Sequence, residues 1–439
     1  MKLSASNPKF AFAVAGFAAA LIAGYLWFPA SSNSAPRVSV TVLVEPTWTF
    51  TFVGKFSEGL AAVSKDGETI GYVEKTGSFV IPPSFDGMGS SGGGGAPFSE
   101  GLALVRNRGD SENWQDGFID KTGNVIIPLE YDDAVSFSEG LALVGKGSDW
   151  ATRKYSFIDK TGRIVMPLEY DAVSHFSEGL AMVGKSYSFN QWKFGFIDKS
   201  GNVVVPLEYD TVGTFSDGLA WAIKERNDID GSEHDDFERV AEIKYGYIDK
   251  NGNIIIPFEH ILPLDPESFD FALGHEGVGF LNFSEGLAVY GESIGMIAIG
   301  ESMTETGDIQ QIFSRDILYG YIDKSGKVVI PAEYNSASSF SEGRAVVSKG
   351  SSCENMKWGF VDTSGKIVIP LEYDSVSDFS EGLAVVSRKN QGTGYIDKAG
   401  EVIVPLEYDA AYPFSEGLAW VQKDGKWGIL LLDPIARQP

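Results

Sequence analysis

Apolar residues in this chain occur in short runs of consecutive positions, separated by turn signals. Gly140–Val144 and Val125–Pro128 are examples, and runs of the type Tyr245–Asp249 lie between them. Successive side chains of a strand point to opposite faces of the sheet, so consecutive apolar positions predict strands that are apolar on both faces. We therefore expect an all-β protein whose small sheets stack on one another.

One hexamer, Phe-Ser-Glu-Gly-Leu-Ala, organises these runs into repeats. It occurs nine times, with Asp217 in place of Glu in one copy and Arg344 in place of Leu in another, and it begins at Phe56, Phe98, Phe137, Phe176, Phe215, Phe283, Phe340, Phe379 and Phe414. A second phrase, Ile-Asp-Lys-x-Gly followed by Pro-Leu-Glu-Tyr-Asp, stands between copies, as in Ile158–Asp171. Such recurrence predicts a repeat protein.

Spacing divides each unit into packed and variable parts. From the phrase Asp to the next hexamer Phe the distance is 17 residues in six units, as from Asp120 to Phe137. From the hexamer Phe to the following Asp the distance is elastic, which indicates a surface loop. The pattern therefore predicts about nine units of three strands each. The hexamer Gly is expected to serve a backbone turn, and its Phe to pack between units as core rather than to bind a ligand.

The two ends of the array hold incomplete units. Thr41–Pro46 resembles a third strand alone, whereas Gly417–Val421 and Lys426–Leu432 resemble a first and a second strand without a third. These halves could complete one unit, as closure into a propeller-like ring requires. They could equally cap an open solenoid. Three-stranded units favour the solenoid-like array, because propeller blades have four strands.

The phrases also carry a family resemblance. Lys357-Trp358-Gly359-Phe360-Val361-Asp362 and Lys426-Trp427-Gly428 resemble the WG repeat family, also called KWG repeats, from about Val42 to Leu432. The signature Trp is replaced by Phe194, Tyr245, Tyr319 or Thr393 in other units, and Ser156 replaces the Gly once. The resemblance implies tandem β units, found mostly in bacterial proteins, and transfers no catalytic residues.

The N-terminus differs from the rest of the chain. Lys2 and Lys9 precede an uninterrupted apolar run, Phe10–Phe28, which is about long enough to span a bilayer as a helix. We expect residues 1–30 to be an uncleaved anchor or a cleaved signal peptide, with residues 31–40 as linker, 41–433 as the array and 434–439 as tail. The anchor is favoured because the run is longer than a typical signal peptide core.

Charge and cysteine content narrow the functional classes. A net charge of −25 argues against nucleic acid and anionic lipid as partners. We expect the protein to contact a membrane only through residues 10–28. The single Cys353 cannot form an internal disulfide. No His-Glu-x-x-His motif occurs, and we assign no catalytic, cofactor or metal residue.

Four insertions interrupt the repeat, at Gly87–Ala96, Glu225–Glu242, His260–Leu281 and Tyr290–Asp316. Insertions on repeats often carry binding. The candidate partner-binding residues are acids and histidines in or beside them: Asp228, Asp230, Glu233, His234, Asp235, Asp236, His260 and His275. The acidic stretch resembles a calcium loop only weakly, since Phe237 stands where the bidentate Glu belongs.

Two functions remain open from the sequence. The first is a non-enzymatic binding or scaffold protein of the bacterial cell envelope, with an extracytoplasmic array that meets a protein or glycan partner. The alternative is an envelope glycan-active enzyme with a carboxylate pair around Asp228–Glu242 and Asp265–Glu276. With either function, the chain is a single-pass membrane-anchored protein, or is secreted or periplasmic if a signal peptide is cleaved.

Overall fold

A computed structural model describes residues 38–87, 95–108, 114–147, 153–188, 191–224, 243–261, 281–303, 309–350 and 355–433. The chain separates into two units, Val40–Asp433 and the terminal segments Met1–Ser39 with Pro434–Pro439; the first is described here. Within the described residues all regular elements are strands, and no helix is long and apolar enough to cross a membrane. The predicted helix Phe10–Phe28 lies outside the described residues.

We number the units 1 to 9 by their hexamers in chain order. A strand follows each hexamer: β3 (Leu60–Ser64), β6 (Leu102–Arg108), β10 (Ala142–Lys146), β14 (Leu180–Ser188), β18 (Leu219–Ile223), β21 (Leu287–Met303), β25 (Ala345–Lys349), β29 (Leu383–Arg388) and β33 (Leu418–Lys423). Its antiparallel partner carries the aromatic-Ile-Asp phrase: β4 (Thr69–Glu74), β7 (Trp114–Asp120), β11 (Lys154–Ile158), β15 (Gln191–Asp198), β19 (Lys244–Asp249), β22 (Ile309–Asp323), β26 (Lys357–Val361), β30 (Gly392–Asp397) and β34 (Lys426–Asp433).

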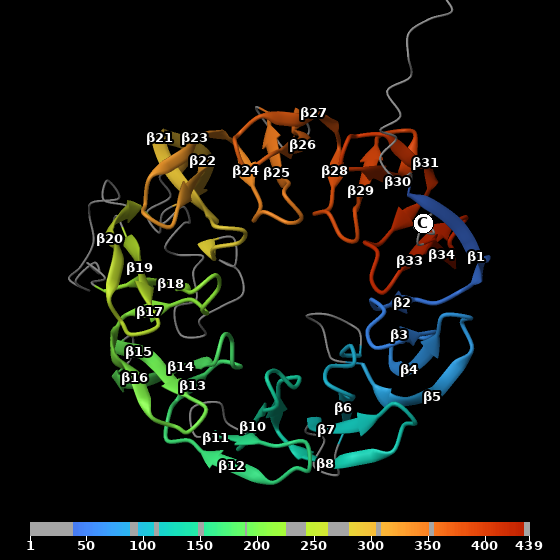
Figure 1. Ribbon diagram of the computed structural model, residues 1–439, viewed down its shortest axis with the longest axis horizontal. Coiled ribbons are helices and arrows are strands. Elements are labelled where there is room, and N and C mark those ends of the chain that lie inside the picture. Colours follow the sequence, from blue (N-terminus) through green and yellow to red (C-terminus); the bar gives the residue numbers. More distant parts are fainter. Residues whose placement is uncertain are drawn as a thin grey trace, which may run out of the picture. The chain divides into compact units, whose positions relative to one another are not determined.

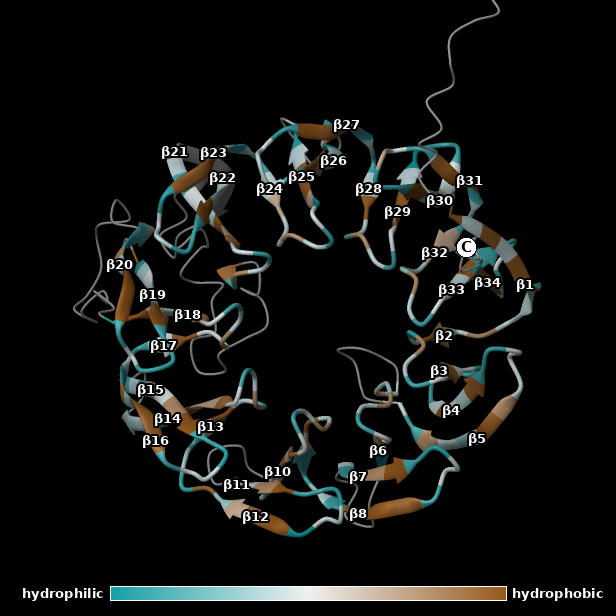
Figure 2. Ribbon diagram, viewed as in Figure 1, coloured by the Kyte–Doolittle hydropathy of each residue, from teal (hydrophilic) through white to brown (hydrophobic). Residues whose placement is uncertain are grey.

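The outer strands carry the Val-Ile-Ile-Pro segments and lie on the outside of the array (Figure 1). They are β5 (Phe79–Asp86), β8 (Val125–Tyr131), β12 (Ile164–Pro167), β16 (Val203–Tyr209), β20 (Ile254–Ile261), β23 (Val328–Tyr334), β27 (Ile367–Tyr373) and β31 (Val402–Tyr408), and β1 (Ser39–Trp48) takes this place in unit 9. Except in β5, their first residues are exposed, Ile164 by 55% and Val402 by 53%. These strands, drawn largely brown in Figure 2, therefore bury only part of their apolar surface.

The expectation of three strands per unit is wrong for most units. A fourth, two-residue strand pairs with the strand after the hexamer: β2 (Phe52–Val53), β9 (Asp133–Ala134), β13 (Ala172–Val173), β17 (Thr211–Val212), β24 (Ser336–Ala337), β28 (Ser375–Val376) and β32 (Ala410–Ala411). A pair of residues carries no periodicity, which is why the pattern did not predict them. Typical sheets have the order β24-β25-β26-β27, whereas units 1 and 2 join into one sheet of seven strands.

The expectation of an open solenoid is also wrong, and the alternative of a ring describes the unit Val40–Asp433. β1 pairs with β34, so the first segment of the array completes the sheet of unit 9. Ser415 Oγ donates to the Phe56 carbonyl at 2.7 Å, as hexamer serines do between consecutive units. Trp420 packs with Phe56 and Val53 in one buried cluster. Closure gives both terminal half-units a partner and leaves no end to cap.

The core lies between neighbouring sheets rather than inside one. Each cluster joins residues of consecutive units, and the hexamer Phe stands at the junction, with Phe176 and Phe215 both 1% exposed. Its ring contacts an aromatic ring of the preceding unit, as in Phe360–Phe379, whose centroids are 4.9 Å apart. The prediction that the repeated Phe forms core is confirmed, and stacking of sheets follows from it.

The glycine of the signature Trp-Gly permits a close approach of two strands. A Cβ at Gly359 would lie 2.5 Å from the Ile369 carbonyl oxygen, and the ladder shifts register there. Unit 3 has Ser156 instead, and its outer strand β12 stops at Pro167. Beyond that point Leu168 is buried and Tyr170 is not, the reverse of unit 7. One side chain thus changes which residues of the outer strand face the core.

Candidate functional site

The Ser-Glu-Gly-Leu segment of each hexamer forms a tight turn, here called the hexamer turn. Ser177 and Leu180 exchange backbone hydrogen bonds of 2.9 and 3.1 Å. Glu178 has φ +51° and Gly179 φ +87°, and the central residues of all nine turns have positive φ. Positive φ at both central positions is the pattern of a type I′ hairpin turn, which Asn-Gly normally fills. The expectation that the hexamer Gly serves a backbone turn is confirmed.

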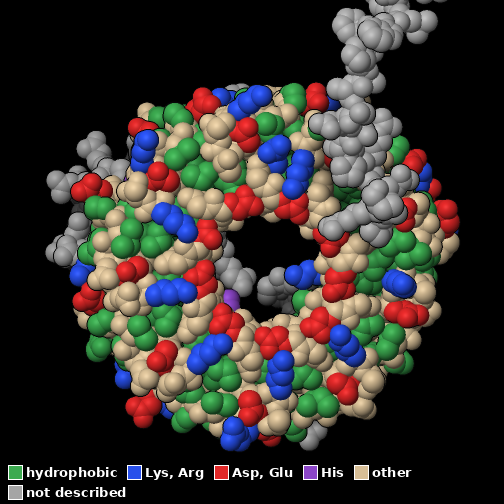
Figure 3. Space-filling model, viewed as in Figure 1, with side chains coloured by type: hydrophobic (Ala, Val, Ile, Leu, Met, Phe, Trp, Pro, Cys, Tyr) green, Lys and Arg blue, Asp and Glu red, His purple; other side chains and the backbone are tan. Residues whose placement is uncertain are grey.

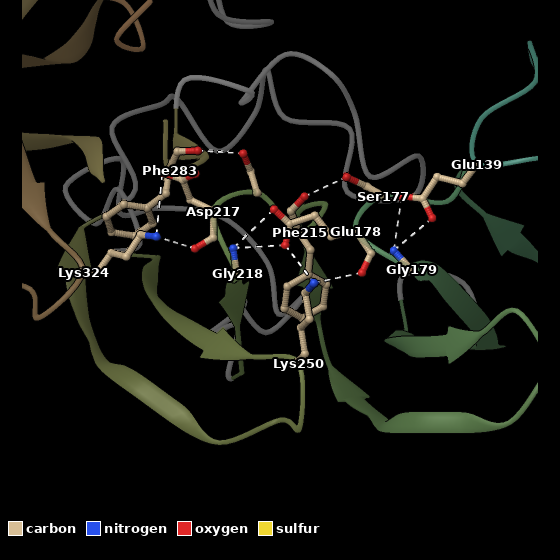
Figure 4. Close-up of polar contacts among 11 residues, drawn as sticks. Glu139, Ser177, Glu178, Gly179, Phe215, Asp217, Gly218, Lys250, Phe283 and Lys324 are labelled. Atoms are coloured by element: carbon tan, nitrogen blue, oxygen red, sulfur yellow. Dashed lines mark hydrogen bonds and ion pairs between the residues drawn. The ribbon is translucent and has the colours of Figure 1, made fainter. Parts of the chain in front are cut away.

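Glutamate is a costly choice for a left-handed position, by about 1–2 kcal/mol. Its carboxylate, however, binds the next unit. Glu139 accepts a hydrogen bond from the Gly179 amide at 3.1 Å, and Glu178 accepts one from Gly218 at 3.1 Å (Figure 4). Ser177 Oγ donates to the Phe215 carbonyl at 2.8 Å. The strained backbone therefore places two side chains where they tie each unit to its successor.

A lysine of the following unit completes this contact. Lys250 Nζ lies 3.0 Å from Glu178 Oε2 and also donates to the Glu178 carbonyl. The same pairing recurs at five other junctions: Lys121–Glu58, Lys160–Glu100, Lys199–Glu139, Lys324–Asp217 and Lys398–Glu342. Figure 3 shows acidic side chains gathered around the opening in the face seen, with basic side chains beside them. Sequence reasoning missed these lysines, although their fixed place before x-Gly in the phrase was a usable signal.

The contacts lower the pKa of three of the turn carboxylates. Partial burial raises the pKa of Glu58, Glu100 and Glu139. Hydrogen bonds from the lysine and the glycine amide together lower it by more, so the net pKa of each lies below the ordinary 4.5. A carboxylate whose pKa is lowered by folding stabilises the fold above its unfolded pKa, and this contribution is lost as pH falls below about 4.5.

Replacing Gly179 by valine is expected to lower the free energy of unfolding by roughly 1–3 kcal/mol. The reason is backbone strain at φ +87°, because beyond the two adjacent residues no atom lies within 4 Å of the added Cβ. Chemical denaturation of the wild type and the variant measures the loss. Gly179→Asn is the control, since Asn tolerates positive φ and should lose less. Equal stability of the valine variant and the wild type would contradict the assignment of strain.

Of the candidate residues from the sequence, the structure describes only His260. It lies in β20, half-buried, opposite Tyr245 in the ladder and with its ring centroid 6.3 Å from that of Tyr290. Burial lowers the pKa of His260. Asp228, Asp230, Glu233, His234, Asp235, Asp236 and His275 lie outside the described residues, and so do both ranges of the enzyme alternative, Asp228–Glu242 and Asp265–Glu276. Among the residues that the structure describes, no three His, Cys, Asp or Glu side chains form a metal-ligand cluster.

Comparison with known proteins agrees with the repeat geometry. The model of the family described as WG containing repeat matches residues 42–68, 70–109, 117–150, 155–186, 194–226, 245–259, 319–352, 358–391 and 394–427. No curated protein matches the sequence.

Two solved structures illustrate the structural matches. An uncharacterized protein from Listeria monocytogenes EGD-e is 10% identical, with a TM-score of 0.38, and the match covers 84% of this chain and 97% of that one. BamB from Moraxella catarrhalis is 11% identical, with a TM-score of 0.28 and coverage of 88% and 85%. Likenesses at these scores do not establish a shared fold. The family segments, by contrast, cover well over half of the sequence and coincide with the repeating sheets, and the chain belongs to the WG containing repeat family.

Proposed function

We propose that this chain is a non-enzymatic binding scaffold of the bacterial cell envelope, whose repeat surface binds a protein or glycan partner. The main support is that the polar side chains of the hexamer are engaged in contacts between units. The hexamer serine and carboxylate are hydrogen-bonded across the junctions, as Ser284 is to Phe340 and Glu285 to Gly343. The polar side chains of the motif thus hold neighbouring units together. The segments that vary between units are then the surface that the ring offers to a partner.

The variable parts are concentrated in units 5 and 6. The segment Tyr290–Asp316, expected to be a loop, is largely a continuation of the hairpin β21–β22, with strands of 17 and 15 residues. The corresponding strands β25 and β26 of unit 7 have five residues each. A hairpin that extends beyond the common sheet length adds backbone surface without disturbing the junctions. This supports placing the partner surface on these units.

Replacing Arg226–Glu242 by the short turn sequence Arg388–Thr393 is expected to leave folding nearly intact, since shortening a surface loop changes closure entropy little. Retention of the envelope partner on the immobilised full-length chain should fall if the insertions carry binding. Quantitative mass spectrometry of the retained proteins and glycans measures this. Partial shortening of another insertion, Gly87–Ala96, is the control for loop deletion as such. Equal retention of partners by both variants and the wild type would mean that the repeat faces, not the insertions, carry binding.

Membrane attachment through Phe10–Phe28 is expected to survive carbonate extraction. The motivation is the length of the apolar run and its bulky end, Trp27-Phe28. Immunoblots of the membrane and soluble fractions measure it, with a peripheral envelope protein as the control. A freely soluble mature chain that begins near Ala35 would overturn the anchor and support a cleaved signal peptide.

A further inference from the structure

A hollow of about 380 Å³ lies at the junction of units 7 and 8, beside the turn that joins β29 to β30. Met356 and Asp374 of unit 7 form one wall, and Arg388, Lys389, Asn390 and Thr393 of unit 8 form the other. Sites for small molecules have volumes of about 300–1,000 Å³. This hollow therefore has room for a ligand of about one sugar ring.

The walls are held in place before any ligand arrives. Asp374 accepts a hydrogen bond from the Lys389 amide at 2.5 Å and pairs with Lys357 at 2.6 Å. The Gln391 amide donates to the Arg388 carbonyl at 3.0 Å and closes the turn. Arg388 pairs with Glu372 at 2.5 Å, and its guanidinium lies over the Tyr373 ring at 4.7 Å. A preformed site loses less conformational entropy when it binds.

The charge of this junction departs from that of the chain. Three cations, Lys357, Arg388 and Lys389, lie at the hollow or pair with its wall, against the carboxylates of Glu372 and Asp374. The protein as a whole has a net charge of −25. Lys389 is exposed, and its charge also acts on Asp374. The exposed ammonium is accessible to a ligand anion.

The remaining wall residues supply polar groups and one apolar surface. Asn390 is exposed at φ +67°. Thr393 stands at the signature aromatic position, so this unit carries a hydroxyl where six other units have a ring: Tyr155, Phe194, Tyr245, Tyr319, Trp358 and Trp427. Met356 is half-buried and contributes a thioether. An amide and a hydroxyl suit ligand hydroxyl groups.

We propose that this hollow binds a small hydroxylated anion, a sugar-sized molecule that carries a carboxylate or a phosphate. The Lys389 ammonium pairs with the oxyanion, Asn390 and Thr393 hydrogen-bond to ligand hydroxyls, and Met356 covers an apolar ring face. This deepens the proposed function and rests on it, because an acidic sugar is the kind of group that an envelope glycan presents.

Calorimetric titration of the full-length protein with glucuronate, glucose 6-phosphate, glucose and inorganic phosphate tests the proposal. At least one of the two acidic sugars should bind about tenfold tighter than glucose, with affinity that falls as salt rises. The better of the two identifies a carboxylate or a phosphate as the anion. Inorganic phosphate binding as tightly as glucose 6-phosphate would overturn the role of the hydroxyls. Absence of binding by both acidic sugars would overturn the site.

Two variants locate the binding. Lys389→Gln should weaken the acidic sugar about tenfold, and Asn390→Gly should weaken it too while its left-handed backbone is kept. Lys426→Gln, in the turn of the next unit, is the control and should bind like the wild type. Equal affinity of Lys389→Gln and the wild type would overturn the assignment. If both sugars fail to bind but the insertion-dependent envelope partner is still captured, this site falls and the proposed function stands.

Discussion

Replacing Trp420 by alanine is expected to lower the free energy of unfolding by about 3–5 kcal/mol, the usual cost of removing a buried Trp. Trp420 is 1% exposed where unit 9 meets unit 1. Its ring stacks on Phe56 with centroids 5.4 Å apart, and its indole N–H donates to the Gly54 carbonyl at 2.9 Å. One side chain thus contributes both packing and a hydrogen bond to ring closure.

Urea denaturation followed by circular dichroism measures this loss, and amide exchange locates it. Exchange should rise first in β1 and β2, because these strands depend on contacts that Trp420 makes across the closure. Trp192→Ala is the matched control. Trp192 is half-buried and stacks on Phe194 within one strand, so its loss should cost less. A cost at Trp420 no larger than at Trp192 would mean that closure does not depend on this residue.

Replacing Gly359 by serine is expected to destabilise the protein by about 1–3 kcal/mol, as overpacking of a tight site does. The added Cβ would stand 2.5 Å from the Ile369 carbonyl oxygen, and backbone cannot rotate away as a side chain can. Unit 3 shows another arrangement of the corresponding outer strand, the pairing of β12 with β11 around Ser156. The variant should therefore move Tyr373, now 3% exposed, toward solvent.

Denaturation measures the cost, and nitration of tyrosines followed by mass spectrometry measures the exposure of Tyr373. Ser156→Gly is the reciprocal control, because it removes a side chain from a junction that already accommodates one, and it should cost no more than about 1 kcal/mol. A Gly359→Ser protein with unchanged stability and a protected Tyr373 would show that the close approach is not what requires glycine.

Much of the architecture could be predicted from residues alone. Nine hexamers and their fixed spacing predicted a β-repeat array, and Phe176 and Phe215 indeed pack at the junctions. The expected turn at Gly179 has positive φ. These features are local or repeat at constant separation, so the pattern of side chains carries them directly.

Other features arose only from contacts between distant segments. Whether Thr41–Pro46 caps a solenoid or completes the last sheet depends on β1 reaching β34, which lies at the other end of the array. The two-residue strand found in most sheets is too short to leave a periodic signal, yet it brings most units to four strands. The lysine that reaches the hexamer carboxylate comes from the next unit, as Lys250 does to Glu178. Chain distance hides such pairings, because only folding decides which units become neighbours.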